Sequence, residues 1–183
     1  MSTIEALKAI LIPPHEPVLT GSSEQWTAFE ARLGMRLPSD FRVLITTYGA
    51  GSANDWFYLI NPFRDARSNF ERWLALHRQA YRESYSQAGP DTFEGLDGTV
   101  PHGLVPFAHG SDGSTAYWNT HLENPDDWTI MEEREFYWQS FRGTTIEYLM
   151  EVITGQYRSI VYGPLPRELP VRFLPWRPLP GGA

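Results

Sequence analysis

The chain of 183 residues contains no cysteine. It can therefore form no disulfide bond, thiolate metal site or thiol nucleophile, and this composition favours a reducing compartment. No apolar run approaches the roughly 18 residues of a membrane-spanning helix. The N-terminal residues also lack the basic region and the long apolar run of a signal peptide. The sequence thus predicts a cytoplasmic protein that has no membrane partner.

Positive charge is scarce in the middle of the chain. Residues 91–155 hold 12 Asp and Glu against 2 Arg, and the whole chain has a net charge of −7. A negative surface repels phosphate backbones and speeds association with basic partners. The distribution therefore predicts a basic protein partner and no direct contact with nucleic acid. A solvated acidic face that serves only solubility is the alternative interpretation.

Two helices with defined ends are predicted between residues 22 and 49. The first begins after Ser22, which forms a capping-box pattern with Gln25, and ends at Gly34. Pro38 prevents its continuation, and we expect Ser39 to cap a second helix that ends at Gly49. Residues 56–60 (WFYLI) then predict a strand that is buried on both faces or nearly so.

The remaining sequence predicts a mixture of helices and strands. Helices are expected over residues 2–11, from about 69 to 88, and from 144 to 155, with strands near 104–108, 114–119, 128–132 and 136–138. Residues 89–103 predict a loop, and 110–113 (GSDG) predict a tight hairpin turn. Six of the 15 prolines fall within 164–180, which predicts an extended arm. At this length one domain can bury about 70% of the unfolded surface.

Three blocks in a fixed order resemble the SMI1/KNR4 family of the SUKH superfamily. The first is a G-x-x-L-P-x-D-F and Y-G-x-G pattern, carried by Leu33, Gly34, Leu37, Pro38, Asp40, Phe41, Tyr48, Gly49 and Gly51. The second is 104–118 (LVPFAHGSDGSTAYW), and the third is 144–155 (TTIEYLMEVITG). The resemblance extends over residues 22–155. The long helix predicted over 67–88 is an insert, and residues 156–183 lie outside the resemblance.

The resemblance implies a fold, a domain boundary and a kind of function. It implies a single small α+β domain, with a central, mainly antiparallel or mixed sheet and helices packed on it. We expect this domain to span residues 1–155, with its core at 22–155, and a proline-rich arm to follow at 156–183. Many bacterial members are immunity proteins that neutralise a cognate polymorphic toxin, often a nuclease. Fungal relatives regulate cell-wall assembly by binding partners. Neither role uses a catalytic residue set.

Residues that could support catalysis or metal binding have simpler interpretations. His109, Ser111 and Asp112 are the residue types of an acyl-transfer triad, but sequence neighbours rarely reach triad geometry, and Ser and Asp are common in turns. His102, His109 and His121 lack the spacing of a helical zinc motif. The segment 49–51 (GAG) follows a helix, whereas a phosphate-binding loop precedes one. We therefore expect no enzymatic activity, cofactor or metal. A hydrolase would require a deep pocket around His109.

The predicted site is a protein-binding surface. Exposed acids would attract a basic partner, and tryptophans beside loops would anchor it, since tryptophan often carries much of the binding energy of an interface. These partner-binding candidates are Trp56, Asp91, Glu94, Asp97, Asp112, Asp126, Asp127, Glu132, Glu133, Glu135 and Trp138. Paired carboxylates such as Glu132 and Glu133 could also suggest a glycosidase, but adjacent strand residues point apart.

Two functions follow from these observations. The first is an immunity protein that binds a toxin, for example a nuclease, and blocks the active site of the toxin or the path of its substrate. The alternative is a regulatory or scaffolding protein of the cell-wall-assembly type that binds a cellular partner. The sequence leaves the choice open, together with the oligomeric state.

Overall fold

The computed structural model describes residues 3–64, 69–88, 103–135, 137–162 and 168–176, with the backbone alone for 81, 82 and 84–88. Five helices, one 3-10 turn and eight strands are formed in this part of the chain. They are, in order, α1 (Thr3–Ile10), β1 (Leu11–Ile12), α2 (Ser23–Leu33), α3 (Ser39–Tyr48), β2 (Gly51–Ala53), β3 (Phe57–Leu59), α4 (Phe70–Ala88), β4 (Leu104–Gly110), β5 (Thr115–Asn119), η2 (Pro125–Asp127), β6 (Thr129–Arg134), β7 (Tyr137–Phe141), α5 (Thr145–Thr154) and β8 (Val171–Pro175).

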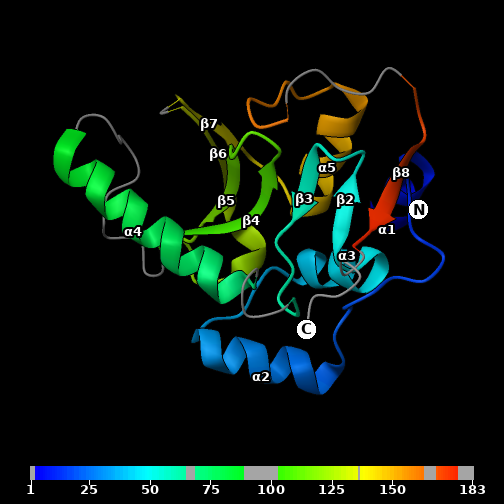
Figure 1. Cartoon of the computed structure of the whole chain (residues 1–183), viewed down its shortest axis with the longest axis horizontal. Coiled ribbons are helices and arrows are strands. Elements are labelled where there is room, and N and C mark those ends of the chain that lie inside the picture. The colour runs from blue at the N-terminus through cyan, green and yellow to red at the C-terminus, as the bar shows by residue number, and fades with distance from the viewer. Residues whose placement is uncertain (1–2, 65–68, 89–102, 136, 163–167, 177–183) are drawn as a thin grey trace, which may run out of the picture.

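All eight strands form one sheet in the order β1-β8-β2-β3-β4-β5-β6-β7. Every pair of neighbours is antiparallel except β1 and β8, which are parallel. Helices pack on this sheet, and α4 runs beside β4 and β5 before its C-terminal end extends away from them (Figure 1). The predicted α+β fold with a mainly antiparallel, mixed sheet is confirmed.

The main core lies between one face of the sheet, called here the inner face, and helices α1, α3 and α5, and buried residues of α2 and α4 also join it. Phe41 of α3 packs edge-on against Trp118 of β5, with ring centroids 4.8 Å apart. Tyr148 of α5 packs against Phe107 of β4 at 5.9 Å. All four side chains are almost completely buried. Burial of such aromatic rings supplies much of the hydrophobic free energy of folding.

Local capping signals in the sequence set the ends of α2 and α5. Ser22 and Gln25 form the expected capping box at the start of α2, and Gly34 ends it with a φ of 73°. Thr144 and Glu147 form the same box for α5, and Gly155 ends that helix with a φ of 76°. Both left-handed residues are glycines because a Cβ disfavours this conformation.

The predicted cap of α3 is wrong. Ser39 is the first residue of the helix, its preceding residue Pro38 offers no side-chain cap, and the Ser39 amide donates instead to Asp126 Oδ1 at 2.6 Å. Asp126 lies in η2, far along the chain. In a second contact of this kind, the Ile146 amide in the first turn of α5 donates to Asp40 Oδ2 at 2.8 Å. Two helix starts are therefore capped by distant segments.

The segment after α3 also differs from its prediction. Gly51 begins a strand, β2, where the sequence predicted only a helix stop, and the next strand is Phe57–Leu59, shorter than the predicted 56–60. Tyr58, at the centre of that strand, is half-buried, so one face of it is open. Gly49 has a φ of 70°, and a Cβ there would lie 2.2 Å from the Val18 carbonyl oxygen.

Part of the proline-rich C-terminal segment belongs to the sheet. Strand β8 inserts between β1 and β2, and its Val171 and Phe173 are buried in the main core. In Figure 1, β8 lies between α1 and β2, so the two ends of the described chain meet in one region of the molecule. No helix among the described residues is long and apolar enough to cross a membrane.

Candidate partner-binding surface

The face of the sheet opposite the main core is called here the outer face. It carries its own small apolar cluster, formed by Leu104 and Tyr117 with Met131 and Trp138 packed against them. A row of paired residues crosses this face from β8 to β7, namely Leu174, Ser52, Tyr58, His109, Thr115, Glu133 and Trp138. Helices α1, α3 and α5 cover the inner face, so among the described residues the parts of the outer face beside α4 are the candidate surface for a partner.

Helix α4 covers the middle of the outer face through a stack of rings. The His109 ring lies between Tyr58 and Trp73, with centroids 5.0 and 4.7 Å away. Trp73 also stacks on His77 at 5.3 Å, and a 2.7 Å hydrogen bond joins His77 Nδ1 to the Tyr117 hydroxyl. The helix that the sequence identified as an insert is thus attached to the sheet by aromatic contacts.

Burial keeps both histidines of this stack neutral near pH 7. It lowers the pKa of His77 to about 4, with a smaller effect from His109, and it also lowers the pKa of His109. His109 Nδ1 donates to the Gly110 carbonyl oxygen at 3.0 Å, and Asp112 Oδ1 accepts hydrogen bonds from Ser114. These contacts are those of a hairpin turn, in agreement with the turn interpretation. No cluster of three metal-ligating side chains occurs among the described residues.

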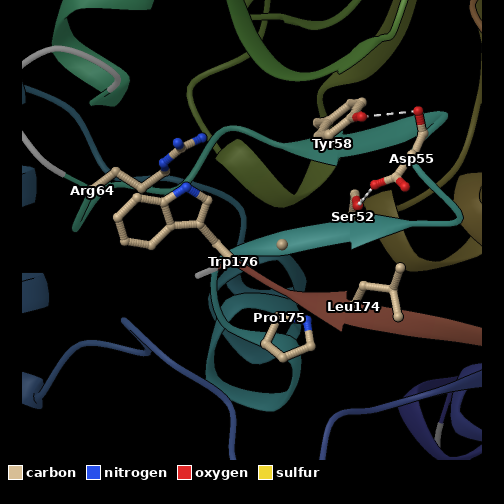
Figure 2. A pocket seen from close by; sticks show the side chains of 8 residues that line it. Ser52, Asp55, Tyr58, Arg64, Leu174, Pro175 and Trp176 are labelled. Atoms are coloured by element: carbon tan, nitrogen blue, oxygen red, sulfur yellow. Dashed lines mark hydrogen bonds between the residues drawn. The ribbon is translucent and has the colours of Figure 1, made fainter. Parts of the chain in front are cut away.

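Beyond the stack, the outer face opens into a groove over β2, β3 and β8, with a volume of about 430 Å³. Figure 2 shows Arg64 and Trp176 side by side at one end, with the guanidinium 5.0 Å from the ring centroid. At the other end, the Ser52 hydroxyl donates to Asp55 Oδ1 at 3.1 Å, and the Tyr58 hydroxyl donates to the Asp55 carbonyl oxygen at 2.9 Å. The groove combines aromatic walls with both charge signs.

The sequence interpretation missed this groove. Tyr58 was assigned to a strand buried on both faces or nearly so, and Trp176 to a proline-rich extended arm. The sequence did contain a turn signal, the pair Asn54-Asp55, because Asn and Asp tolerate positive φ values better than other non-glycine residues. In the structure these two residues have φ values of 48° and 57°. Read as a hairpin turn, this pair would have predicted β2 and the open face of β3.

The described acidic candidates do not form one continuous surface. Asp112, Glu133 and Glu135 lie at the end of the sheet where the β4–β5 and β6–β7 turns are found. Asp126 and Asp127 lie in η2, which connects the opposite ends of β5 and β6. Asp91, Glu94 and Asp97 fall outside the described residues. The expected acidic surface is therefore divided into separate parts.

Several of these acids also hold the fold together. Asp112 Oδ2 forms a 3.2 Å ion pair with Arg134, in addition to its turn contacts. Asp126 caps α3, and Asp127 Oδ2 accepts a 2.8 Å hydrogen bond from the Asn124 amide group. Glu135 is exposed and has a φ of 50°. Glu133 is half-buried on the outer face.

Glu132 is not on the surface, and its assignment to a partner-facing rim is wrong. Its side chain is 0% exposed and points to the inner face. It accepts hydrogen bonds from the hydroxyls of Tyr148 and Ser159, from the Ile160 amide at 3.0 Å, and from the Tyr157 hydroxyl at 3.3 Å. Alternation along β6 puts Glu133 on one face and Glu132 on the other, where it links the sheet to α5 and to the segment that follows α5.

The two candidate tryptophan anchors differ in position. Trp56 packs into the core edge against Tyr162, with centroids 5.8 Å apart, and its indole Nε1 is buried. Trp138 lies half-buried on the outer face of β7, 6.0 Å from the Tyr117 ring. Of the two, Trp138 is on the side of the sheet that a partner can reach.

Comparison with known proteins agrees with this architecture. Residues 20–148 match the model of the SMI1 / KNR4 family (SUKH-1), which covers the first two resemblance blocks and the start of the third. Searches of curated proteins and of solved structures found no match. The matched region contains α2, α3 and strands β2 to β7, so it includes most of the sheet and both faces described above. The chain therefore belongs to the SMI1/KNR4 (SUKH-1) family.

Proposed function

We propose that this protein is an immunity protein that binds a cognate toxin and neutralises it without altering it chemically. The observation that carries the proposal is the family match over residues 20–148, because the family includes immunity proteins and partner-binding regulators. The protein would act stoichiometrically in the cytoplasm, and would cover the active site of the toxin or the path of its substrate. No cofactor or metal is needed for this role.

Charge supports a basic toxin as the partner. A nuclease must attract phosphate groups, so its active-site region carries positive charge. Residues 91–155 carry a net charge of −10, which is opposite in sign to such a region. Within this segment, Glu123 and Asp127 are exposed. Complementary charge of this kind increases the association rate more than it increases the final affinity. Asp91, Glu94 and Asp97 would add to the attraction.

Aromatic side chains on the outer face would stabilise the complex once the two proteins have met. Trp138 at one end of this face, and Tyr58 and Trp176 at the groove, are all half-buried, so their rings have surface left to bury. Rings held in this way lose little conformational entropy on binding. We therefore infer that the toxin would lie across the outer face, with α4 at its centre.

Co-expression tests the proposal. Toxin domains encoded beside this chain are expressed with and without it, and growth is scored. We expect rescue of growth by one toxin, formation of a complex with fixed stoichiometry, and an unchanged toxin mass by mass spectrometry. Absence of rescue, together with stable capture of a cellular cell-wall-assembly component, would favour the regulatory role. A toxin recovered in cleaved or modified form would contradict a purely binding mechanism.

Charge reversal tests the electrostatic part. Glu123→Lys with Asp127→Lys should slow toxin association by about tenfold or less and flatten its dependence on salt. The matched control is Glu16→Lys with Glu168→Lys, which makes the same change in net charge at exposed sites outside the acidic segment. A second test pair is Asp91→Lys with Glu94→Lys. If neither test pair slows association more than the control, steering by this segment is wrong.

A further inference from the structure

The two edges of the sheet are built differently. At one edge β1 has only two residues and is followed directly by Pro13 and Pro14, so it offers little for another strand to pair with. At the other edge β7 has five residues, Tyr137–Phe141, without proline or charge. Among the described residues, no strand pairs with its outer side. Natural proteins usually protect such edges, so an edge that no described strand covers is a candidate interface.

The side chains of β7 also point to a contact. Tyr137 is 75% exposed, the largest exposure among the large hydrophobic residues described. At the other end of the strand, Phe141 is nearly buried and packs edge-on against the half-buried Tyr157, with centroids 5.0 Å apart. An isolated exposed ring and a partly covered ring pair therefore lie at opposite ends of one edge strand.

We propose that β7 pairs antiparallel with β7 of a second copy of this chain, centred on Gln139. A two-fold axis through this residue places Tyr137 of one copy opposite Phe141 of the second copy, and the same contact occurs twice. The exposed Tyr137 ring then covers the Phe141–Tyr157 pair of the other copy. Cross-strand aromatic contacts of this kind stabilise antiparallel pairing.

Charge at the two ends of β7 favours the second copy as the occupant. Glu135 lies just before the strand and Arg142 just after it, and both are exposed. Antiparallel pairing brings Glu135 of each copy near Arg142 of the other, so each dimer contains two such pairs. A parallel arrangement would instead place like charges together. The charges at the two ends of β7 therefore match those of a second β7 only in the antiparallel orientation.

The resulting dimer should be weak. Pairing of two five-residue strands buries less surface than the ~800 Å² per partner of a standard interface. We therefore expect a reversible dimer with a dissociation constant in the micromolar range. Its sheet would continue across both copies, with the two α4 helices on the same side.

Sedimentation equilibrium over a wide concentration range tests the pairing. The full chain should change from monomer to dimer, and Tyr137→Lys should remain monomeric, because it places two like charges at the interface. Leu174→Lys is the matched control, since Leu174 is also an exposed hydrophobic strand residue but lies on the interior strand β8. Circular dichroism checks that both variants are folded. A monomer at every concentration, or a dimer unaffected by Tyr137→Lys, would overturn the proposal.

Charge exchange provides a second test that does not depend on the exposed ring. Glu135→Arg alone and Arg142→Glu alone should each weaken the dimer by about tenfold, and the double exchange should restore it. Failure of the double exchange to restore a dimer lost in both single variants would contradict antiparallel pairing. If the wild-type chain is monomeric and Tyr137→Lys abolishes toxin binding, the edge accepts a strand of the toxin instead, and the second copy is wrong. The dimer does not require that the immunity function be correct.

Discussion

Removal of the Tyr148 hydroxyl offers the sharpest test of the buried carboxylate network. Tyr148 is fully buried and its hydroxyl donates to Glu132 Oε1, so Tyr148→Phe deletes one hydrogen bond without opening a large cavity. A hydrogen bond to a charged group contributes about 1.5–3 kcal/mol, because the carboxylate has no water to replace the lost donor. We expect Tyr148→Phe to lower the free energy of unfolding by that amount.

Tyr48 supplies a matched control in the same core. It is also fully buried, but its hydroxyl donates at 2.7 Å to the neutral carbonyl oxygen of Leu11. Tyr48→Phe should therefore cost only about 0.5–1.5 kcal/mol. Both values are measured by urea unfolding followed by tryptophan fluorescence, with m-values compared to confirm two-state behaviour. A cost for Tyr148→Phe equal to or below that for Tyr48→Phe would refute the reasoning.

A double-mutant cycle identifies the charge as the cause. In a Glu132→Gln background, the acceptor that faces Tyr148 is neutral, so Tyr148→Phe should cost about 1 kcal/mol less than in the wild-type chain. The single variant Glu133→Ala, on the opposite face of β6, should stay within about 1 kcal/mol of wild type. An additive cycle would show that Glu132 does not act through this hydroxyl.

Two further perturbations test the histidine stack and the Gly49 turn. Because burial lowers the pKa of His77 to about 4, the folded state binds fewer protons than the unfolded chain between about pH 6.5 and 4. The free energy of unfolding should therefore fall by up to about 3 kcal/mol as the pH falls through this window. It should fall less in His77→Phe. If urea unfolding gave the same dependence of this free energy on pH for both proteins, the reasoning would be contradicted. Gly49→Ala should destabilise by more than about 2 kcal/mol, because its Cβ would meet the Val18 carbonyl oxygen 2.2 Å away. Gly34→Ala, whose φ is similar but which has nothing within 4 Å, should cost only about 1 kcal/mol in thermal unfolding.

The sequence by itself determined the features that depend on residues a few positions apart. The capping box at Ser22 and the stop at Gly34 appear in the structure as predicted, and the last helix lies within the predicted range of 144–155. The three resemblance blocks are also short patterns around helix ends and a hairpin turn, and they led to the correct family and fold class. Such signals can be read from one sequence because their hydrogen bonds close within one helical turn.

Only the tertiary structure decided which acids are on the surface and how the sheet is ordered. The sequence placed Glu132 in a predicted strand, but the donors that make its burial tolerable come from α5 and from residues after it. Asp40 and Asp126 cap helices 106 and 87 residues away, and β8 enters the sheet beside β1, at the other end of the chain. These outcomes depend on contacts between segments distant in sequence, whose pairing is selected by the burial of the whole core and not by local pattern.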